Sequence, residues 1–510
     1  MSAAHATLGA VTESGRSTLP GAPDATAGSA GAPAPAMSAD DLAAATGGSF
    51  LRRSDRPVRR AAVDSRLVEP GMLFVALPGE RTDGMRFLAE AARAGAAALL
   101  IGRHPDTGAG EAPLESLGDV SVVLVAHPLR GLQDVATAWR NRFSPVVVGV
   151  TGSIAKTSTK EAVAGVLERR FATLRSEGNQ NNEIGLPLTV LRLGPEHGAA
   201  VLEMGMYAGG EISDLARIAR PSIGIVTAVQ PVHLSRLGTL DAIEAAKAEL
   251  VEALPTAAGG GVAILNADDP RVRRMAARTS AAITTYGFAP DADVRAEAVE
   301  SAGFDGMRFQ LVTPAGERAV AIPGLGRLAV HNALAAAATG LAAGIPLDDI
   351  VAGLASPGTA PHRSVVVRAG GITIVDDAYN ASPGSMRAAI ELLTGLPGRH
   401  VAVLGGMREL GEGHDAGHLE VGEVAGDSVD LLVVVDGGPG GAAEGIATGA
   451  RAAGLAPERV MVVADADTAV AALRPRLSPG DVVLVKASRG IELERVVDGL
   501  VAALGGEAAG

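Results

Sequence analysis

The chain has 510 residues and a formal net charge of −13, from 44 lysine and arginine against 57 aspartate and glutamate side chains. This acidic balance argues against non-specific binding to nucleic acid or anionic membranes, and it favours a small-molecule substrate or a soluble partner. The absence of cysteine excludes disulfides, thiolate metal sites and cysteine nucleophiles, and it fits a cytoplasmic location. No apolar run reaches the ~18 residues of a membrane span, and the length predicts about three domains.

Residues 1–38 are rich in alanine, glycine, proline, serine and threonine and show no hydrophobic period. A segment of this composition cannot bury a core, so it is expected to be disordered. It also lacks the basic start and apolar stretch of a secretory signal.

Residues 39–140 are predicted to form a small mixed α/β domain, with a strand over 72–77 and an amphipathic helix over 84–94. Ser65 and Arg66 lie where a strand gives way to a turn, and their hydroxyl and guanidinium groups can meet a phosphate or a ring carbonyl. A surface turn with a solvated arginine is the simpler local interpretation of the same residues.

A second domain is predicted over residues 141–357, where apolar strands alternate with helical patterns. This alternation is typical of a parallel sheet with right-handed crossovers. Residues 293–322 depart from it and predict antiparallel strands attached to that sheet. The expected elements are a connecting helix at 129–142, strands at 146–150, 200–203, 223–226 and 262–265, and helices at 330–343 and 347–354.

A third domain, residues 358–510, follows a linker that contains Pro357, Gly358 and Pro361. Apolar runs and helical patterns alternate again, which predicts a Rossmann-like, doubly wound sheet. The expected strands lie at 372–375, 401–404, 431–435, 460–463 and 482–485.

The stretch VVVGVTGSIAKTSTKEAV, from Val146, is predicted to form a strand, a phosphate loop and a helix. Gly149 and Gly152 allow a tight turn whose backbone N–H groups can hold an anion at the start of a helix. Lys156 adds a charge for the outer phosphates, and the hydroxyl of Thr157 or Ser158 can bind Mg²⁺.

The loop departs from the common G-x-x-x-x-G-K-[ST] pattern, because Val150 and Ala155 occupy its glycine positions. An ordinary turn between a strand and a helix, with a surface lysine, therefore stays open as an alternative.

Acidic side chains lie at the ends of predicted strands, the edge where open α/β sheets bind ligands. Glu203 ends one strand beside the phosphate loop and is a candidate Mg²⁺ ligand. Asp376 and Asp377 form a carboxylate pair at the end of another strand.

Other polar residues have a plain local explanation. His233 lies in a loop, where a histidine is usually structural or solvated. Lys247 lies in the helical pattern LDAIEAAKAELVEAL, which indicates a charged helix face. Asn179, Asn181 and Asn182 precede a helix, and caps and turns often explain such an amide cluster.

The order and spacing of these motifs resemble the ATP-dependent Mur ligases of peptidoglycan synthesis, over about residues 48–500. The phosphate loop of that family reads TG-x-x-GK[ST], which TGSIAKTST follows except at Ala155. The motifs GNQNNEIGLPLTVL, EMGMYAGGEISDL, VDDAYNASPGSM and VLGGMRELGEGHDAGHLEVG resemble those of the members that add D-alanyl-D-alanine. The Asp-Asn-Pro-Arg motif of the diaminopimelate-adding members is absent, whereas DSR…PGMLFVALPGERTDG resembles the UDP-binding domain that both types share.

The resemblance implies a role for each matching residue. The implied ATP-binding residues are Gly152, Ser153, Ala155, Lys156, Thr157, Ser158, Asn332, Arg363 and Asp377. The implied Mg²⁺ ligands are Thr157, Glu203, His233 and a carbamylated Lys247, and the implied catalytic groups are Lys156, Lys247, His233 and Glu203. The implied substrate contacts are Ser65, Arg66, Asn179, Asn182, Tyr379, Asn380 and Ser382.

The resemblance also implies a reaction. ATP would phosphorylate the terminal carboxylate of UDP-N-acetylmuramoyl-tripeptide, and the amine of D-alanyl-D-alanine would attack the acyl phosphate, within a monomer whose domains close around the substrates. A related ligase with a different acceptor and a nucleotide-binding pseudoenzyme in cell-wall assembly are the alternatives.

Four places depart from the family pattern, and they bear on nucleotide affinity more than on the metal site. The departing residues are Ala155, the pair Leu328 and Ala329, the pair Ala228 and Gln230, and Ala487.

Overall fold

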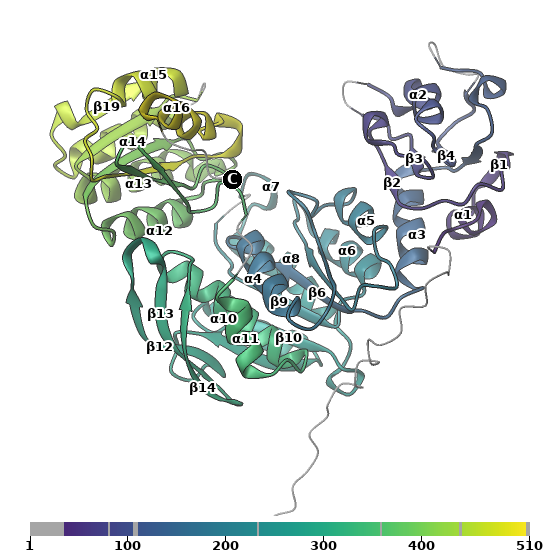
Figure 1. The fold of residues 1–510 in the computed structure, drawn as a ribbon, viewed down its shortest axis with the longest axis horizontal. Coiled ribbons are helices and arrows are strands. Elements are labelled where there is room, and N and C mark those ends of the chain that lie inside the picture. The colour runs from purple at the N-terminus through teal and green to yellow at the C-terminus, as the bar shows by residue number, and fades with distance from the viewer. Residues whose placement is uncertain are drawn as a thin grey trace, which may run out of the picture.

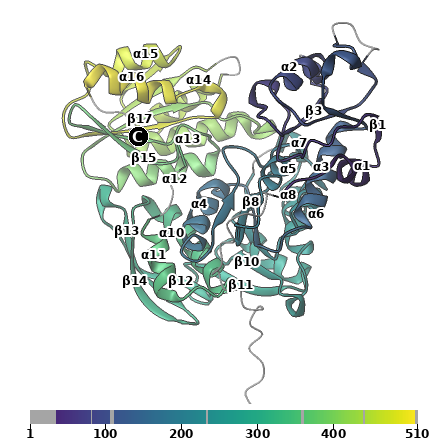
Figure 2. The ribbon, with the colours of Figure 1, turned by 45° about the vertical axis from the view of Figure 1, so that its right-hand side comes forward.

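Three sheets with flanking helices follow one another along the chain in this computed structural model, which describes residues 35–79, 82–105, 111–231, 234–356, 360–437 and 441–505. Figures 1 and 2 show the first and third sheets standing apart on two sides of the central sheet. The predicted α/β class is confirmed. Of the segment expected to be disordered, residues 1–34 lie outside the described ranges. Met37, however, is buried and pairs with Val58, and Ser38 caps helix α1 (Ala39–Thr46), so ordered chain precedes residue 39.

The first sheet has the order β1-β5-β4-β3-β2. Its strands are β1 (Ser49–Arg52), β2 (Ala61–Ala62), β3 (Leu73–Val75), β4 (Ala98–Ile101) and β5 (Ser121–Leu124). The helix predicted over 84–94 is instead a 3-10 turn, Gly84–Phe87, followed by α2 (Leu88–Arg93). The tighter turn arises because the side chain of Asp83 accepts the N–H of Met85 at 3.0 Å.

The central sheet has the order β14-β13-β12-β11-β10-β9-β6-β8-β7. Its strands are β6 (Val146–Thr151), β7 (Thr173–Arg175), β8 (Ala199–Glu203), β9 (Ile223–Val226), β10 (Val262–Asn266), β11 (Ala282–Gly287), β12 (Val294–Ser301), β13 (Met307–Thr313) and β14 (Gly316–Ile322). Strand β12 runs parallel to β11, and β12, β13 and β14 are antiparallel to one another in turn, as residues 293–322 predict. Strand β6 lies between β8 and β9, so the strand order reverses there and the loop after β6 opens into a crevice.

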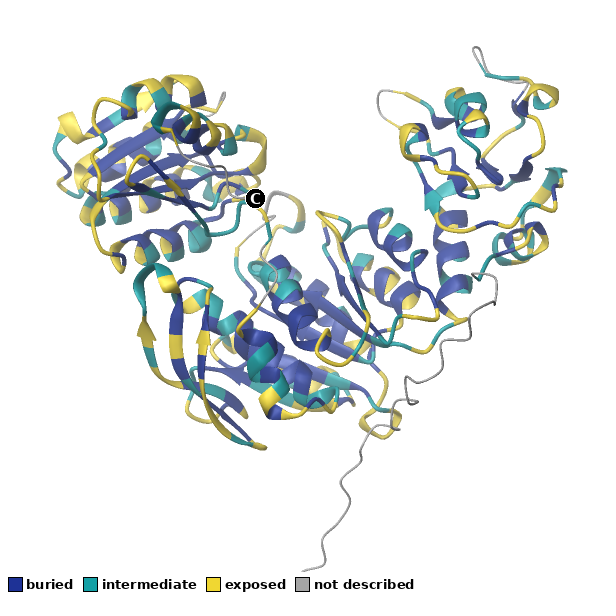
Figure 3. Cartoon of the chain, in the orientation of Figure 1, coloured by how far each residue is buried: buried dark blue, intermediate teal, exposed yellow. Residues whose placement is uncertain are grey.

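Helices cover both faces of the central sheet. They are α3 (Pro128–Arg140), α4 (Lys156–Leu167), α5 (Gly185–Val190), α6 (Glu211–Ala219), α7 (Leu234–Leu237), α8 (Leu240–Glu252), α9 (Pro270–Arg274), α10 (Gly326–Ala342) and α11 (Leu347–Leu354). Val147 faces the core that contains α8, whereas Val148 faces the core that contains α4 and α10. Because both faces are buried, β6, β8, β9 and β10 are largely apolar, and Figure 3 shows them as buried, whereas β12 and β14 carry exposed residues.

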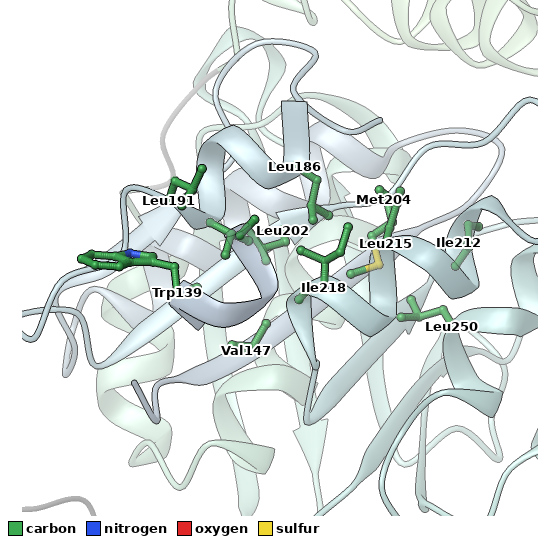
Figure 4. Packing of buried hydrophobic residues seen from close by; sticks show 14 of the residues in the cluster. Trp139, Val147, Leu186, Leu191, Leu202, Met204, Ile212, Leu215, Ile218 and Leu250 are labelled. Carbon is green, nitrogen blue, oxygen red and sulfur yellow. The ribbon is translucent and has the colours of Figure 1, made fainter. Parts of the chain in front are cut away.

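Helix α3 joins the first sheet to the central one through a continuous apolar core. It packs against α1 on one side and α5 and α6 on the other. Trp139 lies near Leu191 and Leu202 in Figure 4, and its indole N–H donates to the carbonyl oxygen of Leu193 at 3.0 Å. The domain boundary near residue 140 stays a prediction, since one hydrophobic cluster spans it.

The third sheet has the order β15-β16-β20-β17-β18-β19, parallel except for the hairpin of β15 and β16. Its strands are β15 (Val365–Ala369), β16 (Ile372–Asp376), β17 (Arg399–Gly405), β18 (Leu431–Val435), β19 (Val460–Val463) and β20 (Asp481–Lys486). Its helices are α12 (Pro383–Thr394), α13 (His414–Ser428), α14 (Ala442–Ala452), α15 (Ala466–Leu473) and α16 (Glu494–Leu504). Within the described ranges, no helix is both long and apolar enough to cross a membrane.

His418 ties α13 to the loop after β17. Its Nδ1 donates to the carbonyl oxygen of His414 at 2.6 Å, and its Nε2 accepts the N–H of Met407 at 2.8 Å. Acceptance at Nε2 requires the neutral ring, and burial lowers the pKa of His418 below its usual value. The unfolded chain binds this proton near pH ~6.5 and the folded chain only at lower pH, so acidification destabilises the fold.

We therefore expect His418→Ala to lower the unfolding free energy by about 2 kcal/mol at pH 7.5. The gap from wild type should narrow at pH 5.5, because only the wild type has a buried imidazole to protonate. Chemical denaturation at both pH values measures this difference, and an unchanged gap would contradict the assignment.

Candidate active site

A cavity of about 1110 Å³ lies between the central sheet and the third sheet, at the carboxyl ends of their parallel strands. Its described lining contains no residue of the first sheet or its helices, so Ser65 and Arg66 lie elsewhere, with Arg66 paired to Asp64 on the surface. The predicted residues that it brings together are Ser153, Ala155, Lys156, Thr157, Ser158, Asn179, Asn182, Glu203, Lys247, Arg363, Asp377, Tyr379, Asn380 and Ser382.

The loop after β6 has the shape of a phosphate cradle. Gly152 has φ 148°, and a Cβ there would lie 1.8 Å from Oγ1 of Thr227, so the position requires glycine. The Thr227 hydroxyl donates to the carbonyl oxygen of Ile154 at 2.6 Å and holds the loop in place. Nζ of Lys156 donates to the carbonyl oxygen of Gly152 at 2.8 Å. Burial lowers the pKa of Lys156, although the nearby charge of Glu203 opposes this, and a phosphate would provide a further negative partner.

Ala155 caps α4 with φ 66° and ψ 0°, in the left-handed region that favours glycine. The loop therefore has the conformation that the family's glycine would adopt, at a cost of about 1 kcal/mol.

We expect Ala155→Gly to raise the unfolding free energy by up to about 0.5 kcal/mol, since the relief of strain exceeds the entropy that glycine adds to the unfolded chain. Ala298, with φ 48°, lies in β12 outside the cavity lining and provides a matched control. Chemical denaturation of both glycine variants, together with calorimetry of ADP binding, checks the result. A loss of stability in Ala155→Gly would show that the loop is not strained.

Glu203 lies at the end of β8, almost fully buried, and faces the start of α4. Its carboxylate accepts the hydroxyl of Thr157 at 2.8 Å and the side-chain amide of Asn181 at 2.8 Å. These hard oxygen donors beside a phosphate loop fit Mg²⁺, which commonly binds one or two carboxylates together with substrate phosphates. Among the described residues no group of three or more histidine, cysteine, aspartate or glutamate side chains is arranged to hold a metal. An ion held by Thr157 and Glu203 would complete its coordination with phosphate oxygens or water.

The three asparagines of the predicted cluster have different roles. Asn181 holds Glu203, a contact that the sequence analysis did not assign. Oδ1 of Asn182 accepts the N–H of Gly185 at 2.9 Å and so caps the start of α5. This is the capping role that the sequence analysis gave as the common explanation of such a cluster. Asn179 lines the cavity. A contact of Asn179 or Asn182 with a substrate stays a prediction.

Lys247 projects from α8 into the cavity and is 3% exposed. No hydrogen bond or ion pair to its Nζ occurs within the described residues. Burial, and then the nearby charge of Lys156, lower the pKa of Lys247 well below its usual range. The ordinary charged helix face considered from the sequence is therefore wrong for Lys247, although Glu244, one turn earlier, pairs with Arg271. His233 lies outside the described residues.

Asn332 lies beneath the phosphate loop rather than in the lining of the cavity. Its Oδ1 accepts the hydroxyl of Thr159 at 2.9 Å, which ties α10 to α4. Leu328 does line the cavity, whereas Ala329 does not. A contact between Asn332 and adenine stays a prediction.

The third sheet supplies the opposite wall. The guanidinium carbon of Arg363 lies 4.2 Å from the ring centre of Tyr379, and Nε of Arg363 is buried without a hydrogen bond. Asp377 pairs with Lys486, the last residue of β20. The sequence analysis did not single out Lys486, although a charged residue that ends a buried strand is the same signal that identified Glu203.

All four lysines of the chain line this cavity: Lys156, Lys160, Lys247 and Lys486. Lys160, Lys247 and Lys486 are buried, and Lys156 is half-buried. Arginine cannot be deprotonated in a protein, whereas the lysine pKa shifts readily on burial. The cavity therefore holds every side-chain amine that the protein has.

The comparisons with known proteins agree with this geometry. The sequence matches the Mur ligase family, catalytic domain over residues 58–138, the Mur ligase middle domain over 150–340, and the Mur ligase, glutamate ligase domain over 362–489. The chain belongs to the Mur ligase family.

Within that family the chain is of the MurF type. It is 39% identical over 468 residues to the UDP-N-acetylmuramoyl-tripeptide--D-alanyl-D-alanine ligase of Mycobacterium tuberculosis, covering 86% of this chain and 91% of the relative. The corresponding ligase of Bacillus subtilis is 36% identical over 448 residues, covering 87% and 93%. A crystal structure of MurF from Acinetobacter baumannii superposes with a TM-score of 0.82 at 30% identity, covering 92% of this chain and 100% of that one. The MurF ligase of Thermotoga maritima in complex with ADP has a TM-score of 0.76 at 30% identity, covering 88% and 98%.

Proposed function

We propose that this protein is the ligase that joins D-alanyl-D-alanine to UDP-N-acetylmuramoyl-tripeptide, with conversion of ATP to ADP and phosphate, in peptidoglycan precursor synthesis. The observation that carries the proposal is the shared cavity, in which the phosphate loop of the central sheet faces Arg363, Asp377 and Tyr379 of the third sheet. The names of the relatives and the ADP complex of a structural neighbour support the choice of substrates and nucleotide.

The chemistry proceeds in two steps. The terminal carboxylate of the tripeptide attacks the γ-phosphorus of ATP, which releases ADP and leaves an acyl phosphate. The amine of the dipeptide then attacks the acyl carbon, and phosphate leaves as the amide forms and the amine loses its proton. Lys156 and Arg363 supply positive charge beside the transferring phosphoryl group, and the cavity positions the two reactants.

Mg²⁺ would be held by Thr157 and Glu203 together with the phosphates, and it would neutralise charge on the group that is transferred. A second ion at His233 and a carbamylated Lys247 is proposed from the family resemblance. The low pKa of Lys247 supports this part, because only a neutral amine adds carbon dioxide, releasing a proton and giving an anion that can bind a cation.

A phosphate-release assay with ATP, Mg²⁺, UDP-N-acetylmuramoyl-tripeptide and D-alanyl-D-alanine, each omitted in turn, tests the proposal. We expect release only with all four components. No release with all four at saturating concentration would overturn it, and release with another dipeptide in place of D-alanyl-D-alanine would identify a ligase with a different acceptor. The left-handed conformation of Ala155 argues against a pseudoenzyme, because the loop keeps its shape.

We also propose, from the sequence, that the protein is a monomer and that it is located in the cytoplasm. Light scattering after gel filtration, at the concentrations used for the assay, measures the first.

A further inference from the structure

Two arginines on the C-terminal wall of the cavity, Arg408 and Arg489, have no acidic partner within the described part of the chain. Of the neighbouring cations, Arg327 lies over the ring of Phe288, with its guanidinium carbon 3.9 Å from the ring centre, and two lysines have acidic partners. Lys486 pairs with Asp377, and Lys160 pairs with Glu161 at 2.8 Å. Arg363 is close enough to Lys156 to lower the pKa of that lysine, so it belongs to the phosphate side of the cavity. Both side chains are exposed to the cavity, and their remaining N–H donors are available to an anionic ligand that enters it.

The fold holds Arg408 in one place. Its backbone N–H donates to the buried hydroxyl oxygen of Ser488 at 2.9 Å, and Nη2 donates to the carbonyl oxygen of Gly490 at 3.0 Å. A Cβ on Gly490 would lie 2.1 Å from Nη1, so the guanidinium packs directly against the backbone of this glycine. The next residue, Glu409, has φ 64°, a strained conformation for a non-glycine residue. Strain of this kind persists where the surroundings fix a functional side chain.

Arg489 lies on the same wall, beside the aromatic ring that borders the phosphate side. Its guanidinium carbon is 4.9 Å from the ring centre of Tyr379, which Arg363 also contacts. The wall therefore runs from Arg363 through Tyr379 to Arg489 and Arg408. A ligand that follows this wall would have one end near the phosphate loop and the other end near the two free arginines.

We propose that Arg408 and Arg489 bind the C-terminal carboxylate of the incoming dipeptide, an inference that rests on the proposed function and names the groups that select its second substrate. A guanidinium group binds a carboxylate through two parallel hydrogen bonds. A dipeptide spans at most about 7 Å, so when its amine lies at the acyl carbon its carboxylate stays within the same cavity. The same two charges repel the ammonium end, which directs the amine toward the phosphate loop.

The test compares D-alanyl-D-alanine with its C-terminal amide as acceptors. Steady-state phosphate release would be measured for the wild type, Arg408→Gln and Arg489→Gln. The matched control is Arg387→Gln, which removes an arginine of the same domain that pairs with Glu420 outside the cavity lining. Thermal unfolding identifies any variant that fails to fold. If Arg408→Gln fails to fold, Arg408→Lys replaces it, because lysine keeps the charge but cannot donate two parallel hydrogen bonds to a carboxylate.

We expect the wild type to prefer the acid over the amide by about 100-fold in kcat/KM. Each glutamine variant should raise KM for the acid by about 10- to 100-fold, leave KM for ATP and the UDP-tripeptide unchanged, and lose most of the preference. An unchanged acid-to-amide ratio in both variants would overturn the inference while the proposed function stands. No turnover of either acceptor by the wild type would instead overturn the proposed function.

Discussion

Lys247→Ala is expected to lower the rate of phosphate release by about 10²- to 10³-fold, without unfolding the protein. Lys247 is buried in the cavity and has no hydrogen-bond or ion-pair partner among the described residues, so alanine would break no polar contact of the fold there. Burial of a lone amine is costly, and the structure retains it where the neutral form has a use.

The proposed use is formation of a carbamate, and chemical rescue tests it. Acetate or another short carboxylate should partly restore the activity of Lys247→Ala, because it supplies an anion where the carbamate would be. Lys247→Arg keeps a cation but cannot add carbon dioxide, so it should stay inactive. Wild-type activity in either variant without added carboxylate would rule out the carbamate. Carbon-13 NMR of the wild type in labelled bicarbonate observes the adduct directly.

Lys156→Ala is the second large effect, with an expected loss of about 10²- to 10³-fold in kcat for phosphate transfer. Its Nζ is held by the carbonyl oxygen of Gly152 at the mouth of the phosphate loop, where the charge of the transferring group develops. Removal of its charge should also raise the pKa of Lys247, because Lys156 is one of the two causes that lower it.

Rapid-quench measurement of ADP formation in a single turnover isolates the transfer step in Lys156→Ala. Arg170→Ala, an exposed cation just beyond α4, is the matched control and should behave as the wild type does. If Lys156→Ala keeps the wild-type rate of transfer while binding ATP weakly, the lysine serves binding alone.

The hydrophobic pattern of the sequence predicted the buried strands, because burial on both faces requires a short run of apolar residues. Short apolar runs such as 146–150 and 431–435 are buried on both faces of a sheet, and they correspond to β6 and β18. The edge strand β15, which pairs with β16, was not predicted because its sequence, VVVRA, has neither a long apolar run nor a strict alternation. Whether such a segment forms an edge strand depends on the strand that it pairs with, which its own sequence does not show.

Site residues that lie at a strand end or in a loop next to it could be predicted from the sequence. Contacts between segments that are far apart in the sequence could not. Glu203 and Lys156 follow from strand ends and loop composition. The bond from Thr159 to Asn332 joins residues that are 173 apart in sequence, and no local pattern indicates it. Arg408 was missed for the same reason, since its position depends on Gly490 in another loop. The roles assigned to Ser65, Arg66 and His233 stay predictions.

The confinement of all four lysines to one cavity gives the protein an unusual property for covalent labelling. An amine-selective reagent small enough to enter would modify side chains in that cavity alone, whereas on most proteins it would scatter over the surface. Protection by bound nucleotide could then be read from the mass of the intact chain. The reagent would act as a probe of cavity occupancy that needs no engineered site.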